Sequence, residues 1–442
     1  MKTSSYSTRK VKQSFEKFFD KSTIKKVAEK AGFIKRAPKK IPAFEFVLGL
    51  LMSFCKKKNT YSHWAEQVAN LSGKKVSKQA LFNRMGEQTV TFSKDLLQAT
   101  VSKKAEVLKG SLIFKSFGKV ILHDSTTLKL PDCLSEVFPG NRCNGVQKAV
   151  ARIQTILDLK TMQFLRFSLS GFTRNDQAAS GDIIPLCSGG DLVIRDLGYF
   201  ASATFNEMAG NGVHFLSRLR FGLKLYKPDG TEIALKTLLK AGKKVDRWIL
   251  IGEKKVVVRL VMMPVPKEVA AEKKRKAKHD RDKRLNHSEA YYKWLEFNVY
   301  VTSVDEDTWT TEDIINAYRV RWQIVPPSGG IKSWKTSGLG MQQLLHDECA
   351  NPHRVKTCIY LMLVFITLFC KKLYLIVLNK MIKSTAQKAI SIIKLFAWVC
   401  ENFVEILAMS QTKFTKMAFE KCCYEKRYTR ENMILTILKC KS

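Results

Sequence analysis

The first 111 residues have the spacing of apolar positions that is typical of helices. Ile41–Phe54 is apolar almost throughout and predicts a buried helix, and Tyr61–Leu71 predicts an amphipathic one. Gly73 ends this pattern, and Ser77 is a suitable N-cap for the next helical segment, Val76–Met85. That segment bears polar side chains suited to a helix-turn-helix: Lys78, Gln79, Asn83 and Arg84. A helical hairpin with one polar face would give the same pattern, and both interpretations stay open.

Residues 112–200 change to short apolar or alternating runs, which are typical of strands. The segments are an apolar run ending in an acid (Lys119–Thr127), two alternating runs joined by a turn (Ala151–Leu159 and Gln163–Ser170), a segment that suits a helix (Arg174–Cys187), and a second apolar run with an acid near its end (Asp191–Phe200). The sequence therefore predicts three antiparallel strands, a helix and a fourth strand.

Asp124 and Asp196 are the acids at the ends of the first and fourth predicted strands. This order of elements begins a ribonuclease-H-like fold, so we expect the two residues to lie side by side although 72 positions separate them (124 to 196). An Asp at a strand end is often only a turn former or a helix cap, and for either acid alone that alternative stays open.

Residues 201–304 resemble an insertion into this core. Val213–Lys224, Trp248–Gly252 and Lys254–Met263 are strand-like, and a basic helical run, Lys267–Trp294, follows them. Phe297–Val304 is one more strand that returns the chain to the core. A charge run of this kind is usually a solvated helix face, and a DNA-facing surface is the alternative. The aromatic side chains at its end either join the core or stack on an unpaired base: Tyr291, Tyr292 and Trp294.

A helix that begins at Thr310 or Thr311 carries the most specific motif of the chain. Offsets of three, seven and fourteen residues return to nearly the same helix face, so four positions form one stripe: Tyr318, Arg321, Val325 and Lys332. A phenol, a guanidinium and an ammonium on one face are suited to a phosphate backbone. The middle of the stripe is Val325, which is followed at once by two prolines.

The spacing Tyr, two residues, Arg, three residues, Glu, six residues, Lys is the signature of the bacterial DDE transposases of the insertion-sequence-four type. The chain resembles this family at Tyr318, Arg321 and Lys332, and the resemblance extends from about Tyr61 to Cys370. It implies an α/β fold with a ribonuclease-H-like catalytic core, a β-rich insertion, and helical N- and C-terminal regions. We therefore expect five parts: a DNA-binding region (1–111), the first part of the core (112–200), the insertion (201–304), the second part of the core with the motif helix (305–375), and a C-terminal region for assembly (376–442).

The resemblance also implies the chemistry. Asp124 and Asp196 would be catalytic residues that bind Mg²⁺, with Mn²⁺ as a substitute, and Tyr318, Arg321 and Lys332 would bind DNA phosphates. The partners would be double-stranded DNA, both transposon ends and target, and a second copy of the chain in the DNA complex. The reaction would be metal-dependent DNA cleavage and strand transfer at terminal inverted repeats.

Val325 departs from the family, which has its third catalytic acid, a Glu, at this position. An isopropyl group cannot bind a metal ion, and Pro326 and Pro327 each cost about 3 kcal/mol inside a helix. We therefore expect impaired or absent chemistry in this chain. The alternative function is a catalytically inactive DNA-binding protein that occupies transposon ends or poisons mixed dimers.

The composition and the charge indicate what kind of partner the chain binds and in which compartment it works. The net charge of +37 over 442 residues favours a polyanionic partner, although an RNA-binding or ribosome-associated protein would satisfy it too. The 11 cysteines form no metal-binding spacing, so we expect reduced thiols. The N-terminus has no apolar export segment, and the apolar run Cys358–Cys370 is shorter than a membrane span. We therefore expect a bacterial cytoplasmic protein, associated with the nucleoid and not with a membrane.

Overall fold

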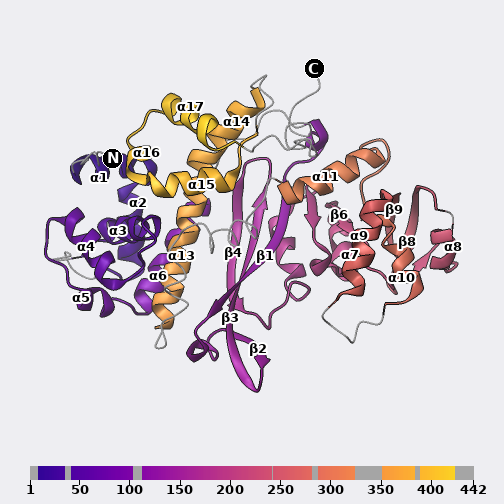
Figure 1. Ribbon diagram of the computed structural model, residues 1–442, viewed down its shortest axis with the longest axis horizontal. Coiled ribbons are helices and arrows are strands. Elements are labelled where there is room, and N and C mark those ends of the chain that lie inside the picture. Colours follow the sequence, from indigo (N-terminus) through magenta and orange to yellow (C-terminus); the bar gives the residue numbers. More distant parts are fainter. Residues whose placement is uncertain are drawn as a thin grey trace. The chain divides into compact units, whose positions relative to one another are not determined.

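The computed structural model describes residues 8–34, 41–102, 112–240, 242–280, 287–323, 351–383 and 389–423 (Figure 1). The chain forms two compact units. The first comprises residues 1–111, 125–174 and 325–442, and the second comprises residues 112–124 and 175–324.

The first unit begins with helices: α1 (Thr8–Phe18), α2 (Lys21–Lys30), α3 (Ala43–Cys55), α4 (Tyr61–Ser72), α5 (Lys78–Phe82) and α6 (Glu87–Ser102). All residues of α3 except Met52 are buried, as the apolar run predicts. Gly49 lets α4 approach closely, because a Cβ there would lie 2.8 Å from Val68 Cγ2. The helices predicted at Ile41–Phe54 and Tyr61–Leu71 are confirmed.

The helical hairpin predicted after Gly73 is present, but its second helix is short. Gly73 has a φ of 69° at the end of α4, and the Ser77 hydroxyl caps the five-residue α5 by accepting from the Ala80 amide. Arg84 packs inward, since its guanidinium donates to the Phe33 carbonyl at 2.9 Å and lies 4.4 Å from that ring's centroid. A helix-turn-helix role for this segment stays a prediction.

The C-terminal part of the first unit is also helical: α13 (Pro352–Phe369), a π-helical turn (Cys370–Tyr374), α14 (Leu375–Lys383), α15 (Ile392–Glu401), α16 (Phe403–Leu407) and α17 (Gln411–Lys421). The apolar helix continues past Lys371, whose ammonium donates to the Thr100 carbonyl at 2.9 Å near the end of α6. Pro352–Met381 is therefore long and apolar enough to cross a membrane, but 83% of its most apolar window is buried. That burial favours a core helix.

The strands of the first unit begin with β1 (Val120–Leu130), whose residues from Ser125 onward belong to this unit. The strand order is β2-β3-β1, with β4 also paired with β3, where β2 is Pro139–Cys143, β3 is Val146–Asp158 and β4 is Gln163–Gly171. β2 and β4 are both antiparallel to β3. β2 was not predicted from the sequence, although Asn144 and Gly145, with φ of 50° and 78°, are typical of a two-residue hairpin turn.

The second unit continues the sheet in the order β1-β5-β6-β10-β9-β8-β7. The additional strands are β5 (Leu192–Arg195), β6 (His214–Arg218), β7 (Leu225–Tyr226), β8 (Val245–Ile251), β9 (Val256–Pro264) and β10 (Phe297–Thr302). β5 is parallel to β1, and β6 is parallel to β5. Antiparallel strands followed by parallel ones in this order form a ribonuclease-H-like core, so the predicted α/β fold class is confirmed. β6 lies within the predicted insertion 201–304, yet its pairing extends the core.

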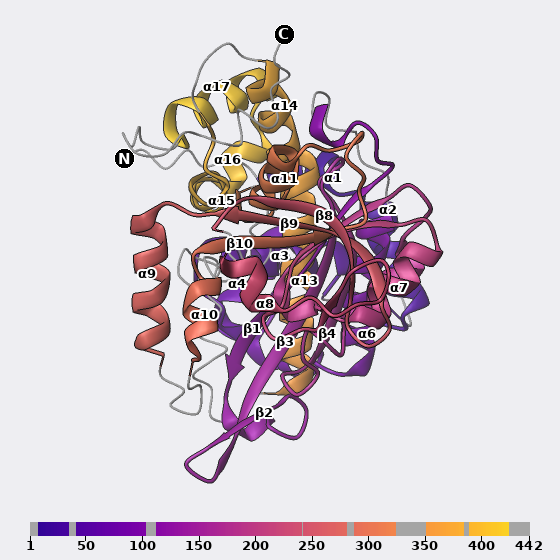
Figure 2. The ribbon, with the colours of Figure 1, turned by 90° about the vertical axis from the view of Figure 1, so that its right-hand side faces the viewer.

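The helices of the second unit are α7 (Ser202–Gly210), α8 (Leu235–Lys240), α9 (Lys267–Lys278), α10 (Glu289–Trp294) and α11 (Thr311–Gln323), and short 3₁₀ turns occur at Leu112–Phe114, Ser180–Leu186 and Leu197–Tyr199. A further 3₁₀ turn, Asp132–Leu134, lies in the first unit. Figure 2 shows α9 and α10 side by side at one end of β9 and β10. The helix predicted over Arg174–Cys187 is wrong: only a 3₁₀ turn forms there, because Pro185 lacks the amide hydrogen that an α-helix needs.

Candidate active site

The pairing of β1 with β5 places Asp124 and Asp196 next to each other. The parallel register ends with His123 opposite Arg195, so the next residues on the two strands are the two acids. Asp196 keeps an extended backbone, with φ of −81° and ψ of 162°. Neighbouring strands lie about 4.8 Å apart, and residues in the same register of parallel strands point to the same face. The two acids predicted from the sequence therefore occupy neighbouring positions on the two strands, although β1 itself continues beyond Asp124 to Leu130.

Asp191 fixes this register, and the sequence analysis missed it. Its buried carboxylate accepts from the Lys119 amide at 2.7 Å and the Ser188 amide at 2.8 Å, and pairs with the Lys119 ammonium at 2.9 Å. Gly118 is required beside it, since a Cβ there would lie 2.7 Å from Asp191 Oδ1. A shift of one residue would turn every side chain of the strand to the other face, so these bonds keep Asp124 opposite Asp196.

The residues directly before the two acids, Arg195 and His123, are buried and polar. Arg195 is fully buried, and its guanidinium donates to the hydroxyl of Ser180 at 2.7 Å and to its carbonyl at 2.5 Å. Burial lowers the pKa of Arg195 to about 10, which still leaves it charged at neutral pH. The His123 ring packs on the Tyr199 ring, with centroids 4.1 Å apart. The residues that precede both acids are thus buried and in contact with neighbouring side chains.

α11 directs Tyr318 and Arg321 to Asp196. Arg321 Nη2 lies 3.1 Å from Asp196 Oδ1, and the Tyr318 hydroxyl lies 3.5 Å from the same oxygen. Both side chains are buried, and burial raises the pKa of Tyr318 to about 12, so its hydroxyl stays protonated. The guanidinium of Arg218 on β6 also lies over the Tyr318 ring, 5.5 Å from its centroid. The offset of three residues therefore places the two motif side chains on one face, as the sequence predicts.

Val325 and Lys332, the other two positions of the motif, lie outside the described residues. α11 is described as far as Gln323. In the ranges that the structure describes, no group of three or more His, Cys, Asp and Glu residues is arranged to hold a metal ion. The described part of the site therefore offers two carboxylates, and the side chain of Asp196 is 40% exposed.

A cavity of about 390 Å³ lies between α9, α10 and the end of β6, and it is lined in part by Leu197, the residue after Asp196. Aromatic and cationic side chains line it, among them Arg218, Phe221, Lys273, Tyr291 and Trp294. Burial, with a contribution from Arg218, lowers the pKa of Lys273 to about 8. The sequence analysis singled out Tyr291 and Trp294 but missed Arg218 and Lys273, which the fold brings to them.

The described geometry fits a divalent cation in charge and donor type, because carboxylate oxygens are the ligands that Mg²⁺ prefers. Arg321 and Arg218 add positive charge beside the acids, which suits a phosphate better than a neutral ligand. The arrangement can therefore hold a metal ion against a phosphate group.

Comparisons with known proteins agree with this geometry. Residues 115–324 match the family model of the transposase DDE domain. The chain is 26% identical over 365 residues to the transposase of insertion sequence element IS231C from Bacillus thuringiensis subsp. berliner, which covers 77% of this chain and 74% of that protein. It is 25% identical over 349 residues to the transposase of IS1151 from Clostridium perfringens, which covers 72% of each.

Among solved structures, the chain is similar to the piggyBac transposase in a synaptic complex with hairpin DNA. The match has a TM-score of 0.43 and 13% identity, and it covers 97% of this chain and 85% of that one. The domain match and the relatives confirm the resemblance that the motif predicts: the chain is similar to transposases of insertion sequences, and residues 115–324 match the transposase DDE domain.

Proposed function

We propose that the chain is a transposase that binds divalent metal ions, Mg²⁺ with Mn²⁺ as a substitute, through Asp124 and Asp196, and cleaves and transfers DNA at the terminal inverted repeats of an insertion sequence. The observation that supports this most directly is the position of the two acids at the end of the β1–β5 pairing, beside Arg321. Such a paired-acid site has no role in a merely basic RNA-binding or ribosome-associated protein.

Cleavage and strand transfer are in-line displacements at phosphorus, for which two bound divalent ions supply activation of the attacking oxygen and stabilisation of the leaving one. The residues of this chain supply the rest. Asp124 and Asp196 would hold the ions through their negative charge. Arg321 binds a phosphate oxygen of the transferred end with guanidinium hydrogens. Tyr318 donates a hydrogen bond and does not act as a base at neutral pH, since burial holds its pKa at about 12.

Val325 and Lys332 complete the proposal. Lys332 binds a further phosphate, and the missing carboxylate at Val325 leaves one metal ion with one ligand fewer. We propose that cleavage by this chain is impaired for that reason. The inactive DNA-binding protein is the second candidate function, and the replacement of the family Glu by Val325 is the observation that favours it.

DNA is the proposed partner because the net charge is +37 and because cationic and aromatic side chains gather in the cavity beside Leu197. Residues 1–111 bind the transposon ends, residues 376–442 serve assembly, and two copies act together in the DNA complex. The protein works in the bacterial cytoplasm on nucleoid DNA.

The test uses labelled duplexes that carry the DNA flanking the reading frame. Gel shifts measure binding, and denaturing gels measure nicking with Mg²⁺ or Mn²⁺. A transposase nicks in a metal-dependent manner, slowly in the unaltered chain, and Asp124→Asn abolishes the nicking without affecting binding. Binding without any nicking identifies the inactive DNA-binding protein. Nicking that persists in Asp124→Asn and Asp196→Asn would overturn the assignment of both acids.

A further inference from the structure

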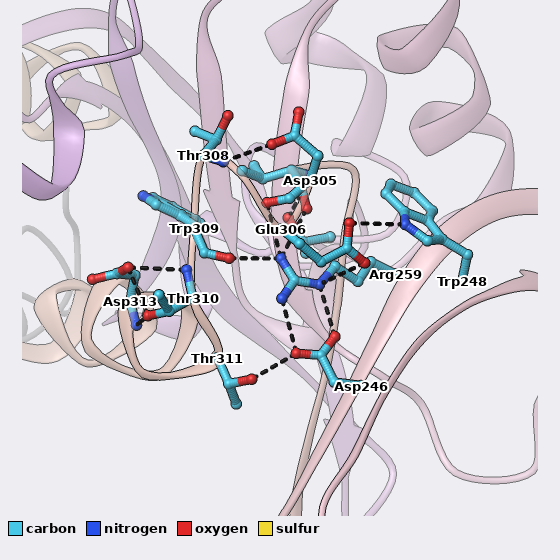
Figure 3. Close-up of polar contacts among 12 residues, drawn as sticks. Asp246, Trp248, Arg259, Asp305, Glu306, Thr308, Trp309, Thr310, Thr311 and Asp313 are labelled. Atoms are coloured by element: carbon cyan, nitrogen blue, oxygen red, sulfur yellow. Dashed lines mark hydrogen bonds and ion pairs between the residues drawn. The ribbon is translucent and has the colours of Figure 1, made fainter.

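Arg259 is a buried cation of the second unit that makes several hydrogen bonds. It lies on β9, is 2% exposed, and binds the Asp246 carboxylate in a fork, with Nε 2.7 Å from Oδ1 and Nη2 2.8 Å from Oδ2. Asp246 is on the neighbouring strand β8, where the register sets it opposite Val261. Figure 3 shows the pair and its surroundings.

The remaining guanidinium nitrogen of Arg259 holds the loop between β10 and α11. Nη1 donates to the carbonyl of Asp305 at 2.9 Å and to that of Trp309 at 2.7 Å. The Glu306 carboxylate lies 3.5 Å from Nε and also accepts from the Trp248 indole at 3.2 Å (Figure 3). This loop is therefore bonded to the β8–β9 hairpin by the buried Arg259 and by the exposed Glu306.

Asp246 also bonds the first residue of α11 directly. The hydroxyl of Thr311, the first residue of α11, donates to Asp246 Oδ2 at 2.6 Å (Figure 3). Thr310 and Asp313 cap the same helix end separately, with the Thr310 hydroxyl 2.7 Å from Asp313 Oδ2. The first turn of α11 thus has a local cap and a bond to the distant hairpin.

The same loop contacts the segment that precedes β1, the strand that carries Asp124. The Trp309 indole donates to the Ile113 carbonyl at 2.8 Å, and its ring packs on Phe117 with centroids 5.1 Å apart. Phe117 precedes β1 by three residues. Tyr318 and Arg321 lie seven and ten residues beyond Thr311, which is about 10 Å and 15 Å along the helix. A shift of the first turn is therefore carried to both side chains.

From these contacts we propose that Asp246 and Arg259 are positioning residues, which hold the start of α11 so that Tyr318 and Arg321 meet Asp196. The β8–β9 hairpin of the insertion then orders the active site from outside the ribonuclease-H-like core. The role of the hairpin in ordering the active site rests on the proposed function. The coupling between the hairpin and α11 does not rest on it and can be tested by itself.

Hydrogen exchange measured by mass spectrometry on the protein without DNA or metal tests the coupling. Thr311→Val removes the hydroxyl but keeps the side-chain shape, Thr311→Ser keeps the hydroxyl, and Asp246→Asn weakens the fork. We expect several-fold faster exchange in Thr311→Val and Asp246→Asn through the second half of α11, which carries Tyr318 and Arg321. Thr311→Ser should exchange as the unaltered chain does.

Thr310→Val is the matched control, since it removes a hydroxyl from the same helix end without touching the hairpin. Its faster exchange should stay within the first turn. The proposal is overturned if Thr311→Val leaves the second half of α11 unchanged, or if Thr310→Val affects it equally. Nicking by the same variants reports on the proposed function separately: if the unaltered chain nicks no DNA, the exchange result still decides the coupling.

Discussion

Arg321 and Asp196 form a hydrogen-bonded ion pair in which Nη2 lies 3.1 Å from Oδ1. The Arg321 side chain is 5% exposed, whereas the Asp196 side chain is 40% exposed. A carboxylate that is paired with a guanidinium attracts a second cation less strongly. We therefore propose that Arg321 neutralises Asp196 when DNA is absent and binds a phosphate when DNA is present.

The first prediction is that Arg321→Gln binds Mn²⁺ more tightly than the unaltered chain when DNA is absent. The expected gain is about two- to fivefold, because a partly exposed ion pair is worth up to about 1 kcal/mol. Electron paramagnetic resonance of free Mn²⁺ measures the affinity. The same variant should bind transposon-end DNA more weakly, so opposite changes in the two affinities are expected. An Mn²⁺ affinity that falls in Arg321→Gln would contradict the competition.

The second prediction concerns Asp191, which holds the register of β1 against β5. Asp191→Asn should lower the free energy of unfolding by about 2 kcal/mol, because buried donors that faced the carboxylate lose their charged acceptor. Urea unfolding measures this loss. Asp182→Asn is the control, since it changes the same residue type in the preceding 3₁₀ turn without altering the contacts of Lys119. Equal losses in the two variants would show that Asp191 has no special role.

The third prediction is a pH dependence of stability from Asp246. Burial raises the pKa of this carboxyl, but the hydrogen bonds from Arg259 and Thr311 outweigh that effect and hold it below its usual range. A lowered pKa gives stability that is fully present above about pH 4, the ordinary value, and is lost as the pH falls through the lower folded value. Between pH 6 and pH 3, the free energy of unfolding measured in urea should therefore fall less in Asp246→Asn than in the unaltered chain. Asp307→Asn, an exposed change in the adjacent loop, should follow the unaltered chain.

The fourth prediction uses the Lys273 ammonium in the cavity beside α10. Burial lowers its pKa to about 8, so its positive charge is lost as the pH rises through that value. DNA affinity should fall between pH 7 and pH 9 in the unaltered chain but not in Lys273→Arg, which keeps its charge. The slope of log affinity against log salt concentration should decrease over the same pH range by the amount expected for about one phosphate contact. Fluorescence anisotropy measures both, and an equal fall in Lys273→Arg would exclude Lys273 as the cause.

The sequence predicted the parts of the site that depend on local patterns. Apolar runs ending in Asp124 and Asp196 gave two buried strands, and the three-residue offset of Tyr318 and Arg321 gave a shared helix face. These signals are contained in single segments, and parallel pairing of the two strands was enough to bring the acids together.

The missed residues depend on pairings between segments. Asp191 is a single acid before a strand, and only its bond to Lys119 shows that it sets the register. Asp246 and Arg259 meet because the β8–β9 register brings them together, which composition and periodicity do not report. The helix predicted over Arg174–Cys187 failed for a related reason, since Ser180 there is held by the buried Arg195 and Pro185 breaks the hydrogen-bond pattern.

The fifth prediction restores the acid that the motif lacks. Val325→Glu alone should recover little nicking, because Pro326 and Pro327 still oppose a helix that aligns position 325 with Arg321, at about 3 kcal/mol each. Val325→Glu combined with helix-forming residues at 326–330 should raise metal-dependent nicking by two or more orders of magnitude, as removing a single transition-state donor costs about 10²- to 10³-fold in enzymes. Val325→Gln in the same background is the control, because it keeps the size of Glu without its charge. Equal nicking with Glu and Gln would show that a carboxylate at this position contributes nothing to metal binding, and the loss at Val325 would then not explain an impaired reaction.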